Sequence, residues 1–131
     1  MRILGIDYGD KKIGLAFGDT DAGVAVPLDV VPNRGQATLE AFAAHAKKED
    51  IDLIVVGVPL PTDARHGAGQ LRKAQAFVRR LAEAVPVPVV EEDESHTTVE
   101  SLRLQHEEGA GAAEDALAAM LIVDQYMRRT R

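Results

Sequence analysis

The chain of 131 residues is 46% hydrophobic and 27% charged, a composition typical of one globular domain that buries a substantial core. It contains no cysteine, which excludes disulfides, thiolate zinc sites and a cysteine nucleophile, so any metal must be held by oxygen or imidazole ligands. The sequence has neither an apolar stretch near the roughly 20 residues of a membrane span nor a basic, apolar leader. We therefore expect one cytoplasmic domain over residues 1–131, without a membrane partner.

The net charge of −6 weighs against a nucleic-acid partner, because neutralising phosphates is the main sequence-independent source of affinity. The charge is unevenly distributed, however. Between Pro59 and Leu81 five bases stand against one acid, whereas between Glu91 and Asp115 nine acids stand against one base. Such a division suits a protein that binds cations in one place and phosphates in another, although two solvated helix faces of opposite charge would give the same pattern.

The chain opens with an apolar run over residues 3–6 that ends on Asp7 and turns through Gly9 into a second run over residues 13–17. A run that is apolar at nearly every position indicates a strand covered on both faces. Asp7 then stands where a central strand leaves the core, and burying a lone carboxylate is costly unless it is paired, hydrogen-bonded or bound to a metal. Asp7 is therefore a candidate functional residue, although an aspartate near a glycine also commonly forms a turn.

The next elements complete the first half of a sheet. Residues 24–31 predict a third strand, which Pro27 places at an edge, and the three strands fit an antiparallel meander. Helical spacing from Leu39 to a charged stop at residues 47–50 predicts a helix. The β-branched run over residues 51–58 predicts a strand buried on both faces, parallel to the first strand and beside it.

The second half of the chain predicts, in order, a loop over residues 59–69, a helix over 71–85, a short strand over 87–90, a helix over 97–109 and a long helix over 113–129. The loop is longer than a connection requires, which is typical of functional loops. The exposed face of the helix that follows carries Arg72, Lys73, Arg79 and Arg80. The order β-β-β-α-β-α-β-α-α indicates an α/β fold, one mixed sheet with helices on both faces.

Three acids occupy comparable positions: Asp7 at the exit of the first strand, Glu94 just past the fifth, and Asp115 in the first turn of the last helix. If the first, fourth and fifth strands are parallel neighbours, Asp7 and Glu94 leave the sheet at its carboxyl edge, where α/β sheets bind ligands. The last helix can bring Asp115 to them. Close carboxylates repel one another, and divalent cations such as Mg²⁺ relieve the repulsion, as in two-metal phosphodiester cleavage.

Each acid also has an ordinary structural explanation. Asp115 could complement the positive end of the helix dipole, and Glu94 could belong to a solvated acidic turn. Asp93 competes with Glu94 for the inward position, because the sequence does not determine the register of the fifth strand. The four histidines show no ligand spacing, so metal binding through imidazole is not expected.

Four segments resemble, in order along the chain, the motifs of the YqgF-type (RuvX-type) nucleases of bacteria, relatives of the Holliday junction resolvases. The segments are DYGDKKIGLAFGD (residues 7–19), VVGVPLPTDARHGAGQLRKAQAFVRRL (55–81), DESHTT (93–98) and DALAAMLI (115–122). The resemblance spans almost the whole chain. It implies a ribonuclease-H-like fold, in which a mixed five-stranded sheet has three antiparallel and three parallel strands that share the first strand.

The resemblance also assigns roles to residues. It gives catalysis and the binding of Mg²⁺ or Mn²⁺ to Asp7, Glu94 and Asp115. It gives contacts with nucleic-acid phosphates to Lys11, Lys12, Arg65, Gly67, Gly69 and Arg72. Members are described mainly as nucleases that trim the 5′ end of precursor 16S ribosomal RNA, and some as junction resolvases.

We therefore expect a metal-dependent endonuclease acting on precursor rRNA, with cleavage of four-way DNA junctions as the alternative. A homodimer would suit junction cleavage, because symmetrical cuts need two active sites. A non-catalytic nucleic-acid-binding module is the second alternative, since the chain departs from the family pattern. Ser95 and His96 replace an arginine and an apolar residue, residues 107–114 are acidic where lysines are usual, and Ala118 takes the place of a fourth acid of the resolvases.

Overall fold

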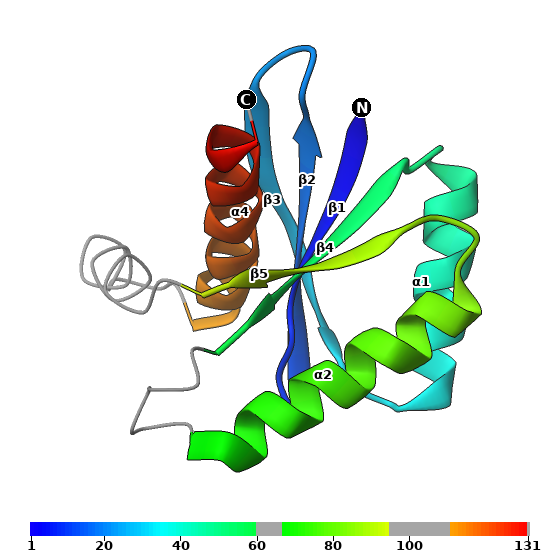
Figure 1. Cartoon of the computed structure of the whole chain (residues 1–131). Helices are drawn as coiled ribbons and strands as arrows, with labels where there is room; N and C mark the ends of the chain where they lie inside the picture. The colour runs from blue at the N-terminus through cyan, green and yellow to red at the C-terminus, as the bar shows by residue number, and fades with distance from the viewer. Residues whose placement is uncertain (60–66, 95–110, 131) are drawn as a thin grey trace.

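The computed structural model describes residues 1–59, 67–94 and 111–130, and these residues form a five-stranded sheet with helices on both faces (Figure 1). The spatial order of the strands is β3-β2-β1-β4-β5. Their bounds are β1 (Arg2–Asp7), β2 (Lys12–Asp19), β3 (Val24–Pro32), β4 (Leu53–Val58) and β5 (Val89–Asp93). β1 pairs antiparallel with β2 and parallel with β4, so the predicted mixed sheet is confirmed, with Pro27 in an edge strand.

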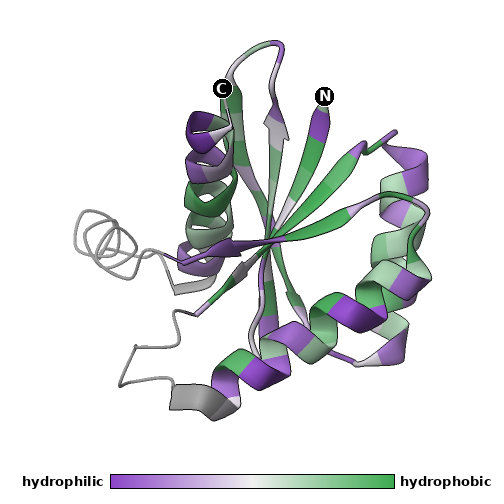
Figure 2. Ribbon diagram, viewed as in Figure 1, coloured by the Kyte–Doolittle hydropathy of each residue, from purple (hydrophilic) through white to green (hydrophobic). Residues whose placement is uncertain are grey.

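Helices α1 (Gln36–Lys48) and α2 (Gly67–Ala84) cover one face of the sheet, and α4 (Gly111–Arg129) covers the other (Figure 1). None of the helices in the described ranges is long and apolar enough to cross a membrane. β1 and β4 are hydrophobic along most of their length, whereas hydrophilic and hydrophobic residues alternate along α2, and α4 is hydrophilic mainly at its two ends (Figure 2). The central strands are therefore buried by helices on both sides, as a continuous apolar run predicts.

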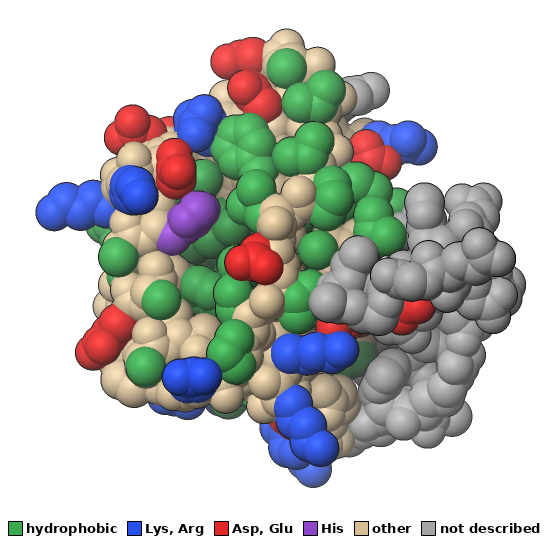
Figure 3. All heavy atoms as spheres, turned by 180° about the vertical axis from the view of Figure 1, so that it is seen from behind, with side chains coloured by type: hydrophobic (Ala, Val, Ile, Leu, Met, Phe, Trp, Pro, Cys, Tyr) green, Lys and Arg blue, Asp and Glu red, His purple; other side chains and the backbone are tan. Residues whose placement is uncertain are grey.

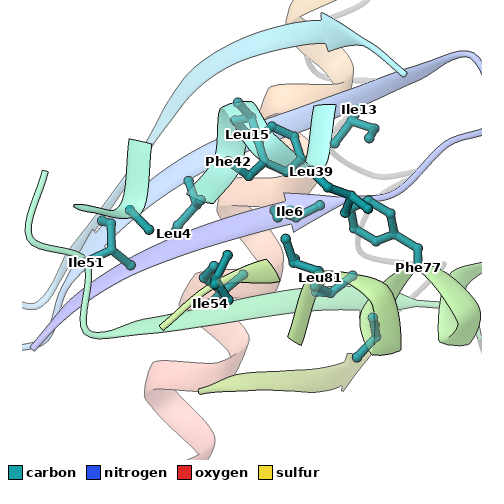
Figure 4. Close-up of a cluster of buried hydrophobic side chains, with 14 of the residues drawn as sticks. Leu4, Ile6, Ile13, Leu15, Leu39, Phe42, Ile51, Ile54, Phe77 and Leu81 are labelled. Atoms are coloured by element: carbon teal, nitrogen blue, oxygen red, sulfur yellow. The ribbon is translucent and has the colours of Figure 1, made fainter. Parts of the chain in front are cut away.

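Alternation along β1 divides the core in two. Leu4 and Ile6 belong to the larger cluster, under α1 and α2, whereas Ile3 packs beneath α4. Gly5 also faces α4, because a Cβ atom there would collide with Val123. In the larger cluster, side chains of the sheet point toward those of the two helices (Figure 4), and its largest members include Leu4, Ile6, Ile13, Ile54, Leu39, Phe42, Phe77 and Leu81.

Several predicted boundaries are wrong. The fourth strand begins at Leu53 rather than at residue 51, and the last helix begins at Gly111 rather than at residue 113. α2 begins at Gly67, so the last residues of the predicted loop, 67–69, are helical. The fifth strand is Val89–Asp93 rather than residues 87–90, because its parallel ladder with β4 continues as far as the pairing of Val58 with Asp93. The predicted helix over 97–109 and residues 60–66 of the predicted loop lie outside the described residues.

The carboxyl edge of the sheet is where β1, β4 and β5 all end. β3 ends there too, because Pro32 pairs with Lys12 at the start of β2, so α1 begins at this edge. α2 and α4 also start near it, since Lys73 contacts Asp10 and the Asp115 backbone lies against Gly14. The positive ends of three helix dipoles therefore face the same edge, which favours anions there.

Candidate active site

Asp7 and Asp115 lie side by side at the carboxyl edge, because Gly14 lets α4 approach the sheet. Asp7, the last residue of β1, pairs with Gly14 of β2. A Cβ atom on Gly14 would collide with the carbonyl oxygen of Asp115, so only glycine permits this contact. Because side chains alternate between the two faces along β1, Asp7 lies on the same face as Gly5, toward α4. The structure thus brings together two acids that are far apart in the sequence.

The surroundings of Asp115 fit a hard cation. Its side chain is only 19% exposed, and Nζ of Lys12 lies 3.3 Å from Oδ2. Oδ2 is fully buried and accepts no hydrogen bond from any described residue, so the lysine contact is a poorly aligned ion pair. Buried carboxylate oxygens are normally hydrogen-bonded or bound to a cation, and oxygen is the ligand that Mg²⁺ and Mn²⁺ prefer.

Asp115 is the fifth residue of α4, two residues further into the helix than predicted. The acid in the first turn is Glu114. Because the effect of the helix dipole falls off within the first turn, complementing the dipole is a weaker explanation for Asp115 than the sequence suggested.

Glu94, rather than Asp93, continues the α4 face of β5. The amide of Glu94 donates a 2.8 Å hydrogen bond to the carbonyl oxygen of Val58, so the ladder extends past the end of the strand. Val90 packs in the cluster under α4, and the period of two along a strand then assigns Glu94 to the same side. Asp93 falls on the opposite side and is exposed.

Glu94 nevertheless stands apart from the two aspartates. β4 lies between β1 and β5, so Asp7 and Glu94 belong to strands about 10 Å apart. Within residues 1–59, 67–94 and 111–130, no three histidine, aspartate or glutamate side chains are close enough together to hold a metal ion. The structure therefore supplies a pair of acids on the α4 face, with Glu94 on the same face but further along the edge.

Glu92 is a buried acid that sequence reasoning did not single out. It pairs in register with Gly57, which pairs with Asp7, yet its side chain is only 3% exposed. Arg129 Nη2 donates to Glu92 Oε1 at 2.6 Å, and Gln125 Nε2 donates to Glu92 Oε2 at 2.7 Å. Gln125 Nε2 also lies 2.7 Å from the carbonyl oxygen of Asp93, so these contacts tie α4 to the end of β5 next to Glu94.

Arg129→Leu is expected to lower the melting temperature by roughly 5–10 °C, because it leaves the buried Glu92 carboxylate without its cation. The hydrogen bonds and negative charge of Glu92 raise the pKa of the Arg129 guanidinium above its usual value, so the arginine remains charged throughout the working pH range. Arg128→Leu is the matched control, because Arg128 pairs, among the residues the structure describes, only with Asp124 at the surface, at 3.0 Å, and should shift the melting temperature by at most about 2 °C. Calorimetry measures both melting temperatures, and an equal decrease in the two variants would contradict a stabilising role for the pair of Arg129 and Glu92.

The predicted phosphate-contacting residues are spread along the same edge. Lys11 is exposed in the β1–β2 turn, Lys12 pairs with Asp115, and Arg72 is exposed on α2. Gly67 and Gly69 lie in the first turn of α2, and Arg65 lies outside the described residues. The view from behind shows lysine and arginine side chains gathered at the lower rim, the carboxyl edge (Figure 3).

Sequence reasoning missed Gly14. The observed pairing of Asp7 with Gly14 centres the hairpin between Asp10 and Lys11, so counting outward from a turn at Gly9 does not find this partner. The Lys12 contact with Asp115 had no local signal either, because it depends on how α4 crosses the sheet.

Comparisons with known proteins identify the family of the chain. A family model described as "RuvX: Holliday junction resolvase" matches residues 1–129. A relative from Anaeromyxobacter sp. (strain Fw109-5), described as "Putative pre-16S rRNA nuclease", is 39% identical over 133 residues, which cover 97% of this chain and 96% of the relative. A relative from Streptococcus sanguinis (strain SK36) with the same description is 32% identical over 138 residues, which cover 98% of this chain and 99% of the relative.

Among solved structures, the fold is similar to that of Thermus thermophilus RuvC in complex with a Holliday junction substrate. The TM-score is 0.61 at 18% sequence identity, and the match covers 99% of this chain and 95% of RuvC. At that identity the likeness shows the fold alone, and it confirms the predicted ribonuclease-H-like sheet. Because the family model spans nearly the whole chain and relatives above 30% identity cover it almost end to end, the protein belongs to the RuvX family of nucleases.

Proposed function

We propose that this chain, as one domain over residues 1–131, is a divalent-metal-dependent endonuclease that processes the 5′ end of precursor 16S rRNA. Asp7, Glu94 and Asp115 are its proposed metal-binding and catalytic residues. The observation that carries the proposal is the juxtaposition of Asp7 with Asp115, whose buried Oδ2 accepts no hydrogen bond from the described residues. The RNA substrate is supported by the descriptions of the relatives. Such a role would place the protein in the cytoplasm.

Different residues of the chain would bind the metal ion and attract the substrate. When bound, Mg²⁺ or Mn²⁺ would supply charge neutralisation and activation of water at the scissile phosphodiester. Asp7 and Asp115 would hold the ion from β1 and α4, and Glu94, one strand further along the same edge, would have to come closer to join them. Lys12, beside Asp115, and the starts of three helices attract the phosphates of the substrate to the edge.

Lys12→Gln is expected to raise the affinity for Mn²⁺ about 3–10-fold, because the ion no longer competes with the ammonium group that neutralises Asp115. Titration calorimetry with Mn²⁺, without nucleic acid, measures this directly. Lys11→Gln is the matched control, since it removes the same charge from the adjacent exposed position, and its affinity should change less than about 2-fold. A lowered affinity in Lys12→Gln, or equal gains in both variants, would count against competition at Asp115.

Cleavage of four-way DNA junctions is the second candidate function, favoured by the description of the family model. It differs from RNA processing in what it requires of the assembly. Two symmetrical cuts need two active sites, so junction cleavage predicts a homodimer, whereas trimming one RNA end does not.

A cleavage panel tests the proposal. Precursor 16S rRNA, RNA and DNA duplexes and a four-way DNA junction are incubated with Mg²⁺, Mn²⁺ or EDTA, and the oligomeric state is measured by light scattering. We expect cleavage of the precursor RNA that EDTA abolishes. Preferential cleavage of the junction by a dimer would replace the first candidate with the second. Metal-independent binding of the panel without cleavage would identify a non-catalytic module instead.

A further inference from the structure

A pocket opens at the carboxyl edge on the face opposite Asp115. Its volume is about 300 Å³, and it lies between the β1–β2 turn, the start of α1 and the middle of α2. The lining residues that matter here are Tyr8, Asn33, Gly35, Lys73, Ala76 and Arg80. We call it the α2 pocket.

The α2 pocket begins one residue from the candidate active site. Tyr8 directly follows Asp7 and turns to the other face of the sheet, where its ring packs on that of Phe77 with the centroids 4.7 Å apart. A strand of nucleic acid that presents a phosphate to Asp7 therefore passes close to the mouth of the pocket as it crosses the edge.

The charge of the α2 pocket is positive. Lys73 and Arg80 line it from α2, and none of the described acids contributes to the lining. Lys73 Nζ lies 3.3 Å from Asp10 Oδ2, but both side chains are about half exposed, so this pair is weak and easily exchanged. Arg80 forms no ion pair within the described part of the chain. A guanidinium in this position can bind two oxygens of one phosphate.

The wall opposite the cations is held in place before any ligand arrives. Asn33 Nδ2 donates to the carbonyl oxygen of Gly9 at 2.9 Å, and the amide of Gly35 donates to Asn33 Oδ1 at 3.1 Å. Gly35 is the N-cap of α1, with φ of 62°, and the first turn of α1 contains no acid. The positive end of α1 therefore adds to the charge of Lys73 and Arg80 rather than opposing it.

We propose that the α2 pocket is a substrate subsite that binds a backbone phosphodiester of the nucleic-acid strand running past Asp7. This inference rests on the proposed nuclease function, because it takes the strand to cross the carboxyl edge. It adds a second point of attachment on the other face of the sheet. The strand is then held on both sides of the edge, which fixes the position of the scissile bond along it.

Binding experiments in EDTA test the pocket without cleavage. Fluorescence anisotropy measures the affinity for labelled single-stranded RNA, for the matching DNA strand, and for a labelled nucleoside monophosphate. Arg80→Gln should weaken strand binding about 5–10-fold and reduce the slope of log K against log salt by about 0.7. Arg79→Gln removes the same charge from an exposed neighbour outside the pocket, and should weaken binding less than about 2-fold.

A second pair of variants tests the shape of the pocket separately from its charge. Ala76→Leu fills the α2 pocket without changing any charge and should weaken strand binding as much as Arg80→Gln does. Ala82→Leu makes the same change at an exposed position of α2 outside the pocket, and should have no effect. Circular dichroism and the melting temperature confirm that each variant is folded before its affinity is compared.

The possible outcomes separate this subsite from the nuclease proposal. Selective losses in Arg80→Gln and Ala76→Leu support the subsite even if the wild-type protein cleaves nothing in the panel. Equal losses in Arg80→Gln and Arg79→Gln, or an unaffected Ala76→Leu, would overturn it in favour of diffuse attraction. Tight binding of the monophosphate without strand binding would also overturn it, because the pocket would then serve a free nucleotide.

Discussion

Asp7→Asn should lower the rate of metal-dependent cleavage by at least about 10³-fold, equivalent to about 4 kcal/mol of transition-state stabilisation. The amide keeps the size of the side chain but loses the charge that holds a divalent ion at the end of β1 beside Asp115. Single-turnover cleavage of the best substrate from the panel measures the loss. Folding and binding of nucleic acid in EDTA should remain within about 2-fold of wild type, because Asp7 lies at the edge of the core and its neutralisation reduces repulsion of phosphate.

Asp21→Asn is the matched control for that experiment. It makes the same chemical change in the turn between β2 and β3, at the far end of the sheet, where Asp21 is exposed and lies 3.7 Å from the N-terminal amine. Its cleavage rate should stay within about 2-fold of wild type. If Asp7→Asn cleaved as fast as this control, Asp7 would have no part in the chemistry.

Gly14→Ala should reduce cleavage at least about 10²-fold and destabilise the protein by about 1–3 kcal/mol. The added methyl group would meet the backbone of Asp115 and Ala116, which cannot move aside by a change of rotamer. α4 must therefore lift from β2, and Asp115 moves away from Asp7. Mn²⁺ titration calorimetry, alongside cleavage and melting temperature, measures the loss of the paired site.

Gly57→Ala distinguishes the loss of the site from a general loss of packing. A methyl group at Gly57 would collide with the side chain of Ile122, on the same helix, but this side chain can repack. The variant should lose a similar amount of stability while keeping its affinity for Mn²⁺ within about 3-fold. Parallel losses of Mn²⁺ affinity in both glycine variants would mean that α4 responds as a whole, and that Gly14 has no special role.

Much of the sheet followed from local patterns. The unbroken apolar runs of β1 and β4 predicted strands buried on both faces, and Pro27 predicted an edge strand, because these signals depend on neighbours in sequence. The extension of β5 through Glu91, Glu92 and Asp93 could not be predicted this way. Three consecutive acids disfavour a strand locally, and only Arg129 and Gln125, more than 30 residues later, make the buried Glu92 acceptable.

The candidate site likewise has features that follow from local sequence and features that depend on tertiary packing. The sequence by itself determined that Asp7 ends a strand, that Glu94 follows one and that Asp115 lies near the start of a helix, since strand and helix periodicity is local. Which acids meet was decided only in the tertiary structure. Gly14 admits α4 against β2 and sets Asp115 beside Asp7, whereas the intervening β4 keeps Glu94 a further strand away. The crossing point of a helix over a sheet depends on close packing between distant segments, and no short stretch of sequence contains that information.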